Sequence, residues 1–114
     1  MKVEINSQTL ELHYSMRIYI IYEQMTDKSI NPSDFDKMTN VITLLYATIL
    51  ATLQYNRKPA SLDWNDYIDW LDTHNDVIVE FSEWFIQQVE AQKSAEPVKE
   101  TKKGALPRKK KSIA

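Results

Sequence analysis

Cysteine is absent from this 114-residue sequence, and glycine occurs only once, at Gly104. Without cysteine the chain cannot form a disulfide, a thiolate zinc site or a cysteine nucleophile. Phosphate-binding loops of the Walker and dinucleotide-binding types need glycines that let the backbone approach the phosphate, so these loops are excluded as well. The two histidines, His13 and His74, lie far apart in the sequence and lack a metal-ligand spacing.

Long apolar runs are also missing. The amino-terminal segment MKVEINSQTLELH alternates charged with aliphatic residues and lacks the unbroken apolar segment of a signal peptide. Residues 38–56 carry no charge, but their apolar centre, residues 41–53, is shorter than the ~20 residues that span a bilayer, and it contains threonines. We therefore expect no membrane segment and interpret residues 38–56 as a helix that is buried or faces a protein partner.

Acidic and basic residues are divided unevenly along the chain. Residues 1–93 hold 7 Lys and Arg against 14 Asp and Glu, whereas residues 94–114 hold 7 Lys and Arg against 2 Glu. The second segment also contains two prolines and the single glycine, and it has too few apolar residues to offset the entropy of ordering its backbone. We predict an acidic domain, residues 1–93, followed by a flexible basic tail, residues 94–114.

The hydrophobic pattern predicts a mostly helical α+β fold. Alternation over residues 2–6 and 9–14 predicts a β-hairpin that turns at Asn6-Ser7-Gln8. Because two strands alone are marginal in water, the hairpin is expected to pack on a bundle of about four α-helices. Helical spacing, together with serine or aspartate caps at Ser15, Ser33 and Ser61 or Asp63, places these helices at about residues 16–26, 33–56, 63–72 and 76–93.

Five aspartates recur every three or four residues around two tryptophans and a tyrosine: Asp63, Asp66, Asp69, Asp72 and Asp76. Carboxylates at this spacing could share a divalent cation, but a calcium loop needs a glycine and alternate ligands that are lacking here. A solvated acidic face explains them better. The serines have no glycine elbow and no local histidine partner, so we predict neither catalysis nor a cofactor.

The first two helices carry more apolar residues than one face can hold. Helix 16–26 can bury a stripe against the hairpin: Ile18, Ile21, Tyr22 and Met25. Helix 33–56 has a second stripe: Val41, Ile42, Leu45, Ile49 and Leu53. Helix 76–93 has a third: Val77, Ile78, Phe81, Trp84, Phe85 and Val89. Further apolar residues lie off these stripes, among them Met16, Tyr19, Ile20, Tyr46, Leu50, Val79 and Ile86.

The surplus has two explanations. The residues off the stripes either fill both sides of a central helix within one core, or they form an exposed apolar patch to which a protein partner binds. We favour the second explanation. Our prediction for the partner-binding residues is the set Met16, Tyr19, Ile20, Tyr46 and Leu50.

The basic tail offers a different function. Its cations, Lys102, Lys103, Arg108, Lys109, Lys110 and Lys111, could bind nucleic acid through counterion release. No aromatic residue lies between them to stack on bases, and the acidic domain would repel a nucleic acid backbone. A solubilising or regulatory tail, or one that docks on an acidic surface, is therefore favoured. A small nucleic-acid-binding or virion structural protein that acts through this tail is the alternative function.

Three features occur in an order that resembles a known family. They are the opening KVEIN…LELHYSMR, the segment IIYEQMTDKSINP that follows it, and the W-x-x-Y-x-x-W-L-D segment that begins at Trp64. Across residues 1–90 the chain is similar to the short tail assembly chaperones of long-tailed phages and prophages. It departs from the expected pattern at the hairpin turn, where Asn6-Ser7 replaces Asn-Gly.

The resemblance implies a non-enzymatic role in the cytoplasm of an infected bacterium. Such chaperones coat the aggregation-prone tape measure protein while the tail tube polymerises around it, and they are absent from the finished virion. Many also have a longer form, made by ribosomal frameshifting, that recruits tail tube protein. The expected partners are thus a tape measure protein, tail tube protein through a longer form, and further copies of this chain.

Overall fold

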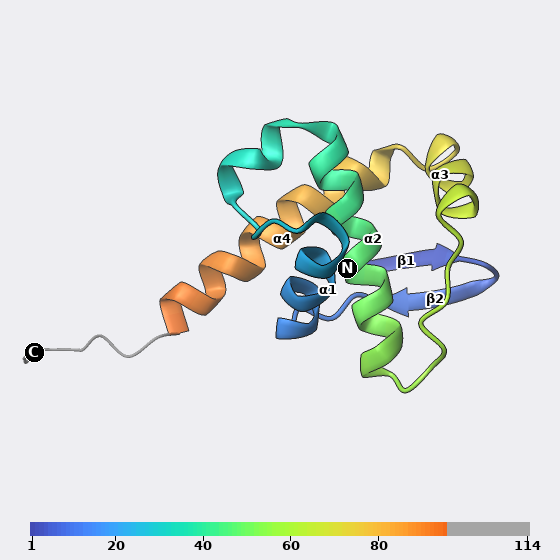
Figure 1. Ribbon diagram of the computed structural model, residues 1–114, viewed down its shortest axis with the longest axis horizontal. Coiled ribbons are helices and arrows are strands. Elements are labelled where there is room, and N and C mark those ends of the chain that lie inside the picture. Colours follow the sequence, from blue (N-terminus) through green and yellow to red (C-terminus); the bar gives the residue numbers. More distant parts are fainter. Residues whose placement is uncertain (96–114) are drawn as a thin grey trace, which may run out of the picture.

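The computed structural model describes residues 1–95 and shows a two-stranded hairpin followed by helices (Figure 1). The elements run β1 (Lys2–Ile5), β2 (Gln8–Glu11), α1 (Met16–Thr26), a 3₁₀ helix η1 (Pro32–Asp36), α2 (Met38–Tyr55), α3 (Trp64–Asp72) and α4 (Asp76–Ala95). The predicted mostly helical α+β class, with an amino-terminal hairpin and four α-helices, is confirmed. Helix α4 continues two residues past the predicted domain boundary, and the rest of the predicted tail lies outside the described residues.

The hairpin turns where it was expected. Lys2 pairs with Glu11 and Ile5 with Gln8 in an antiparallel register, so two residues connect the strands. Both connecting residues have positive φ, 54° at Asn6 and 62° at Ser7, which is the backbone of a type I′ turn. Asparagine tolerates this region well, whereas serine is less suited to it than the glycine common at this position.

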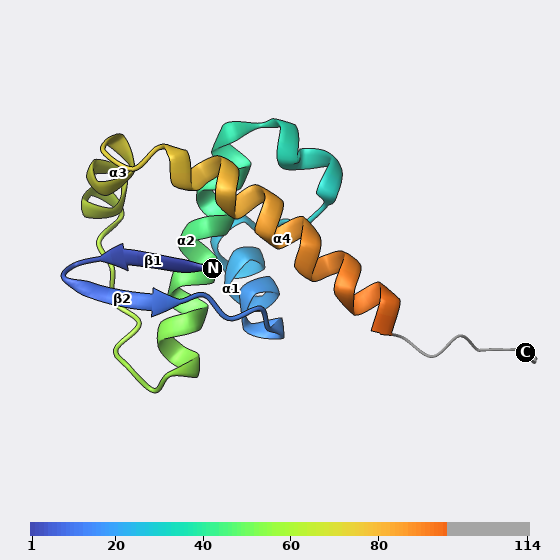
Figure 2. The same ribbon diagram turned by 180° about the vertical axis from the view of Figure 1, so that it is seen from behind.

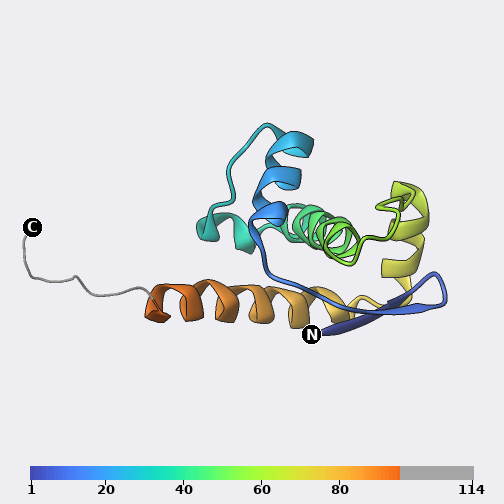
Figure 3. The same cartoon turned by 90° about the horizontal axis from the view of Figure 1, so that it is seen from below.

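Helix α2 is the centre of the fold. Figure 3 shows it nearly end-on, between α1 on one side and α4 on the other. Nine of its residues are buried: Val41, Leu44, Leu45, Ala47, Thr48, Ile49, Ala51, Thr52 and Leu53. They point to most sides of the helix because α1, α4, η1 and β2 all pack against it. For α2, therefore, the explanation by a central helix within one core is correct.

The buried threonines of α2 are compatible with this environment because their hydroxyl groups are paired. Thr48 Oγ1 donates to the carbonyl of Leu44 at 2.8 Å, and Thr52 Oγ1 donates to the carbonyl of Thr48 at 2.8 Å. Thr52 Oγ1 also accepts from the backbone N–H of His13 at 3.1 Å. A buried hydroxyl without a partner would destabilise the core, so these bonds allow polar residues inside it.

The start of the second helix was predicted wrongly. The prediction placed it near Ser33, but residues 32–36 form η1, and α2 begins only at Met38. The side chain of Asn31, rather than Ser33, caps the 3₁₀ turn, since its Oδ1 accepts from the N–H of Ser33 at 3.1 Å. Lys37 then adopts an extended backbone, φ −102° and ψ 120°, which separates the two helices.

Two details of α1 also differ from the prediction. Ser15 occupies the N-cap position, but its side chain makes no capping hydrogen bond, and its Oγ is buried without a partner in the described part of the chain. Met25, in the last turn, is 40% exposed, whereas Ile18, Ile21 and Tyr22 are buried as predicted. Helix α1 packs chiefly on α2 rather than on the hairpin, so the predicted residues are buried, Met25 excepted, but against a different element than predicted.

Ile18 and Ile20 on α1 provide a matched pair for testing the core. Ile18 is fully buried and Ile20 is 55% exposed. We expect Ile18→Ala to lower the free energy of unfolding by roughly 2–5 kcal/mol, because it leaves a cavity. Ile20→Ala should change it by no more than about 0.5 kcal/mol. Urea unfolding of both variants measures the difference, and equal losses would contradict the orientation of α1.

The amino terminus gives a second prediction. The Met1 ammonium donates to Glu11 Oε2 at 2.7 Å, and this hydrogen bond lowers the pKa of the Glu11 carboxyl below its ordinary value. A lowered pKa in the folded state stabilises the fold above the ordinary pKa, and this stabilisation is lost as the pH falls through the folded value. We expect Glu11→Gln to lower Tm at pH 7 but not near pH 3. Glu4→Gln, which removes a carboxylate from the same exposed hairpin face, is the matched control for Tm at pH 7.

Candidate protein-binding surface

Large apolar side chains stay exposed after the core has formed. Those with the largest exposed fractions are Met16 (72%), Met38 (65%), Val79 (63%) and Ile20 (55%). They come from α1, from the first turn of α2 and from α4, so they are not contributed by one helix alone. Val79 and Ile86 were predicted to lie off the main stripe of α4, and both are exposed. Phe81 and Phe85 of that stripe are fully buried.

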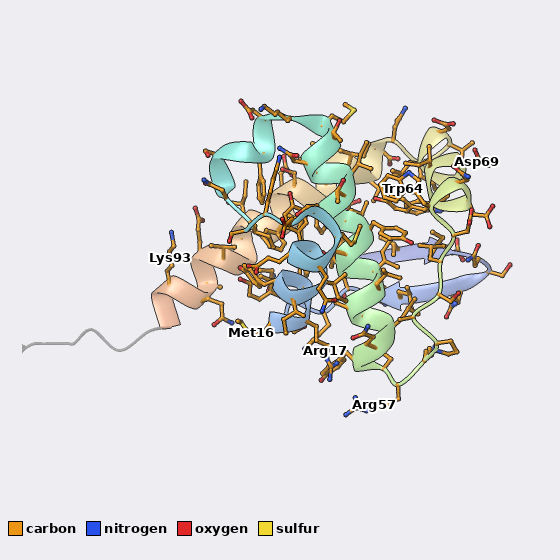
Figure 4. The ribbon with its side chains drawn as sticks, viewed as in Figure 1. Met16, Arg17, Arg57, Trp64, Asp69 and Lys93 are labelled. Carbon is orange, nitrogen blue, oxygen red and sulfur yellow. The ribbon has the colours of Figure 1, made fainter. Side chains whose placement is uncertain are left out.

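The first exposed surface lies at the start of α1. Met16 and Ile20 are four residues apart and therefore share a face of the helix. Beside Met16 is a hollow of about 350 Å³, which is also lined by Tyr14, Ser15, Tyr19 and Gln92. We call Met16, Ile20 and this hollow the α1 surface. Figure 4 shows Met16 at the edge of the molecule, on the side where α4 ends near Lys93.

The two tyrosines of the α1 surface are fixed by their neighbours. Their hydroxyl groups are hydrogen-bonded to each other, and their rings lie 5.5 Å (Tyr14) and 6.4 Å (Tyr19) from the ring of Phe85, between centroids. Burial, followed by the hydrogen bond with Tyr19, raises the pKa of Tyr14, so its hydroxyl stays neutral at physiological pH. Tyr19 is thus partly buried, and it offers a partner only part of its ring.

Tyr46 and Leu50 do not belong to this surface. The Tyr46 hydroxyl donates to the carbonyl of Leu62, and the Tyr46 ring lies 5.0 Å from that of Trp64. Burial raises the pKa of Tyr46 as well. Leu50 is partly buried against the core. Figure 4 places Trp64 and Met16 on different sides of α2, so the five residues of the predicted partner-binding set do not form one continuous surface.

The aromatic segment of α3 has a structural role. Tyr67 is fully buried, and its hydroxyl donates to the carbonyl of Ile42 at 2.6 Å. Trp70 Nε1 donates to the carbonyl of Glu4 at 2.8 Å. The W-x-x-Y-x-x-W pattern therefore attaches α3 to α2 on one side and to β1 on the other. Burial raises the pKa of Tyr67 and keeps its hydroxyl available as a donor.

The aspartates around this segment are exposed, as the interpretation of a solvated acidic face requires. Asp63 caps α3, because its side chain accepts from the N–H of Asp66 at 3.1 Å. In Figure 4, Asp69 points outward from α3, away from the packed aromatic rings. Within residues 1–95, no three acidic or histidine side chains come together in a way that could hold a metal ion.

A second apolar surface was not predicted as such. It is a groove of about 340 Å³ between η1, the first turn of α2 and α4. Its lining is mostly apolar and carries two acids: Phe35, Asp36, Met38, Val41, Ile78, Val79, Ser82 and Glu83. We call it the α4 groove. Exposed Val79 was the single sequence signal for it, because the 3₁₀ turn that supplies Phe35 had been assigned to a longer helix.

No family model, curated protein or solved structure matches the chain. None of the helices within residues 1–95 combines the length and the apolar character needed to cross a bilayer. The predicted tail cations, Lys102, Lys103, Arg108, Lys109, Lys110 and Lys111, lie outside the described residues. Within the described residues, the candidate protein-binding surfaces are the α1 surface and the α4 groove.

The role of the α3 aromatic residues can be tested with two tryptophans. Trp70→Phe removes the N–H that binds the Glu4 carbonyl, while Trp64→Phe removes a similar ring area without that hydrogen bond. We expect Trp70→Phe to destabilise the protein by about 1 kcal/mol more than Trp64→Phe in urea unfolding. An equal effect would show that the hydrogen bond does not hold α3 to the hairpin.

Proposed function

We propose that this protein is a tail assembly chaperone of a long-tailed phage or prophage. It binds the tape measure protein in the bacterial cytoplasm while the tail tube assembles, and it is absent from the finished virion. The resemblance over residues 1–90 supports this proposal. The structural observation that carries it is the α1 surface, where Met16 and Ile20 remain mostly exposed beside an apolar hollow.

The α1 surface suits an amphipathic helix of the client. Two apolar residues four apart match the i, i+4 spacing of a helix stripe, and the hollow beside Met16 can take a side chain from it. The Tyr14–Tyr19 pair gives the hollow a fixed wall, since both rings rest on Phe85. Binding of this kind needs apolar residues at regular intervals on the client but little sequence specificity.

Such a contact is weak, and weakness serves the proposed role. Covering Met16 and Ile20 contributes on the order of 3 kcal/mol. A dissociation constant of 1 mM already corresponds to about 4 kcal/mol, so one surface alone binds loosely. Many copies along a long client would keep it coated through repeated contacts, and each copy could leave as the tail tube advances.

The charge of the domain fits a coating protein. Residues 1–93 carry twice as many acidic as basic residues. The acidic domains of separate coated complexes repel each other and keep these complexes apart in solution. Self-association, and a longer form of the chain that recruits tail tube protein, belong to the same proposal.

Co-expression with the tape measure protein of the same phage tests the function. We expect the wild-type chain to raise the soluble fraction of the tape measure protein several-fold. Met16→Glu with Ile20→Glu should abolish the gain, because charges replace the exposed apolar side chains. The matched control is Ser61→Glu with Asn65→Glu, which adds the same charge at two exposed positions four apart outside the α1 surface.

The outcomes separate the parts of the proposal. An unchanged soluble fraction with the wild-type chain would contradict chaperone function. A double α1 variant that works as well as wild type would show that the client binds outside the α1 surface. Mass spectrometry of purified particles gives an independent check, since finding the chain in the virion would identify it as a structural subunit.

A further inference from the structure

The α4 groove combines an apolar centre with acidic edges. Met38 and Val79 lie in it with 65% and 63% of their surface exposed. Asp36 on the η1 side and Glu83 on the α4 side are exposed carboxylates that also line it. Lys37 is the one cation next to them in sequence. A complementary ligand would therefore carry a short apolar segment with positive charges on both sides.

The chain itself contains such a segment outside the described residues. Residues 102–111 read KKGALPRKKK, in which Ala105, Leu106 and Pro107 are preceded by two lysines and followed by four cations. The order basic, apolar, basic matches the acidic, apolar, acidic order across the groove. The carboxyl-terminal segment and the groove are thus complementary in both charge and hydrophobicity.

The length of the chain permits this contact within one molecule. Figure 2 shows α4 passing η1 and continuing to the end of the described chain. Val79 precedes Ala95 by sixteen residues of helix, which is a distance of about 24 Å at 1.5 Å per residue. The ten residues 96–105 span up to about 33 Å when extended, at roughly 3.3 Å per residue. Ala105 can therefore come back as far as Val79.

We propose that the α4 groove is the docking site for the chain's own residues 102–111. Leu106 and Pro107 cover Met38 and Val79, and the flanking cations approach Asp36 and Glu83. Docking is intramolecular, so the effective concentration of the tail is about millimolar and modest contacts are sufficient. This inference is independent of the proposed function, because it involves no client and uses a surface other than the α1 surface.

Engineered cysteines can test the docking, because the natural chain contains none. The test protein carries Val79→Cys in the groove and Ala105→Cys in the tail. The control carries Gln87→Cys with Ala105→Cys. Gln87 is exposed, lies outside the groove lining and is closer to Ala95 than Val79 is. Both helix positions have Glu83 four residues away, so the two thiols have a similar acidic neighbour.

Both proteins are incubated at low micromolar concentration in a glutathione redox buffer, and the disulfides are measured by mass spectrometry. We expect the 79–105 disulfide to form within monomers with an effective concentration at least tenfold above that of the control. The difference should shrink at 1 M salt, where the screening length falls to about 3 Å. Adding Glu83→Lys should reduce it as well.

Three results would overturn the inference. Equal effective concentrations for the two pairs would mean that the tail does not select the groove. A higher effective concentration for the control pair would mean that tether length alone decides. A 79–105 disulfide found only between two molecules would identify the occupant as the tail of a second copy. None of these results affects the co-expression test, so the two proposals can fail separately.

Discussion

Burial of α2 on most of its sides is the constraint on which the rest of the structure depends. Covering only one face of this uncharged helix of eighteen residues would leave much apolar surface in water, so several elements pack around it. Helix α1, helix α4, η1 and β2 supply this cover. The threonines can be inside because Leu44, Thr48 and His13 provide partners for their hydroxyl groups. Each surrounding element is therefore positioned by the face of α2 that it covers.

The same constraint produces the exposed surfaces. Each covering helix uses one stripe to cover α2, so its apolar residues off that stripe are not buried there. On α1 these are chiefly Met16 and Ile20, and on α4 they include Val79. The core uses much of the apolar surplus that the sequence shows, and the four most exposed of the remaining residues form two separate patches rather than one. One patch suits a client helix, and the other, with its acidic edges, suits a basic segment.

The polar groups of the buried and partly buried tyrosines and tryptophans hold the fold together. Tyr67 and Trp70 bind backbone carbonyls of α2 and β1, and the hydroxyls of Tyr14 and Tyr46 are paired with neighbouring groups. These bonds give each polar group inside the aromatic interior a fixed partner. Other arrangements of α3 would leave the groups without one, so a single arrangement is favoured. Asp63 caps α3, and the exposed aspartates of this segment supply negative charge.

Local signals in the sequence determined most of the elements. Alternation of apolar residues fixed the hairpin, and caps and breaking residues placed α1, α3 and α4 within one or two residues of their observed bounds. Val79 and Ile86 were also placed correctly off the main stripe of α4, and both are exposed. All of these features depend on residues close together in the chain, so spacing alone was enough to find them.

Only the tertiary structure decided which apolar faces meet. Tyr46 was predicted to be at the surface, but Trp64 and Tyr67 of α3 pack against it. Leu50 is partly buried against the core, and Met25, predicted to be buried, is 40% exposed. The α4 groove needed Phe35 and Val79, which are distant in sequence and come together only across the fold. Helical spacing says that a stripe exists, but the direction in which it points is set by contacts between distant segments.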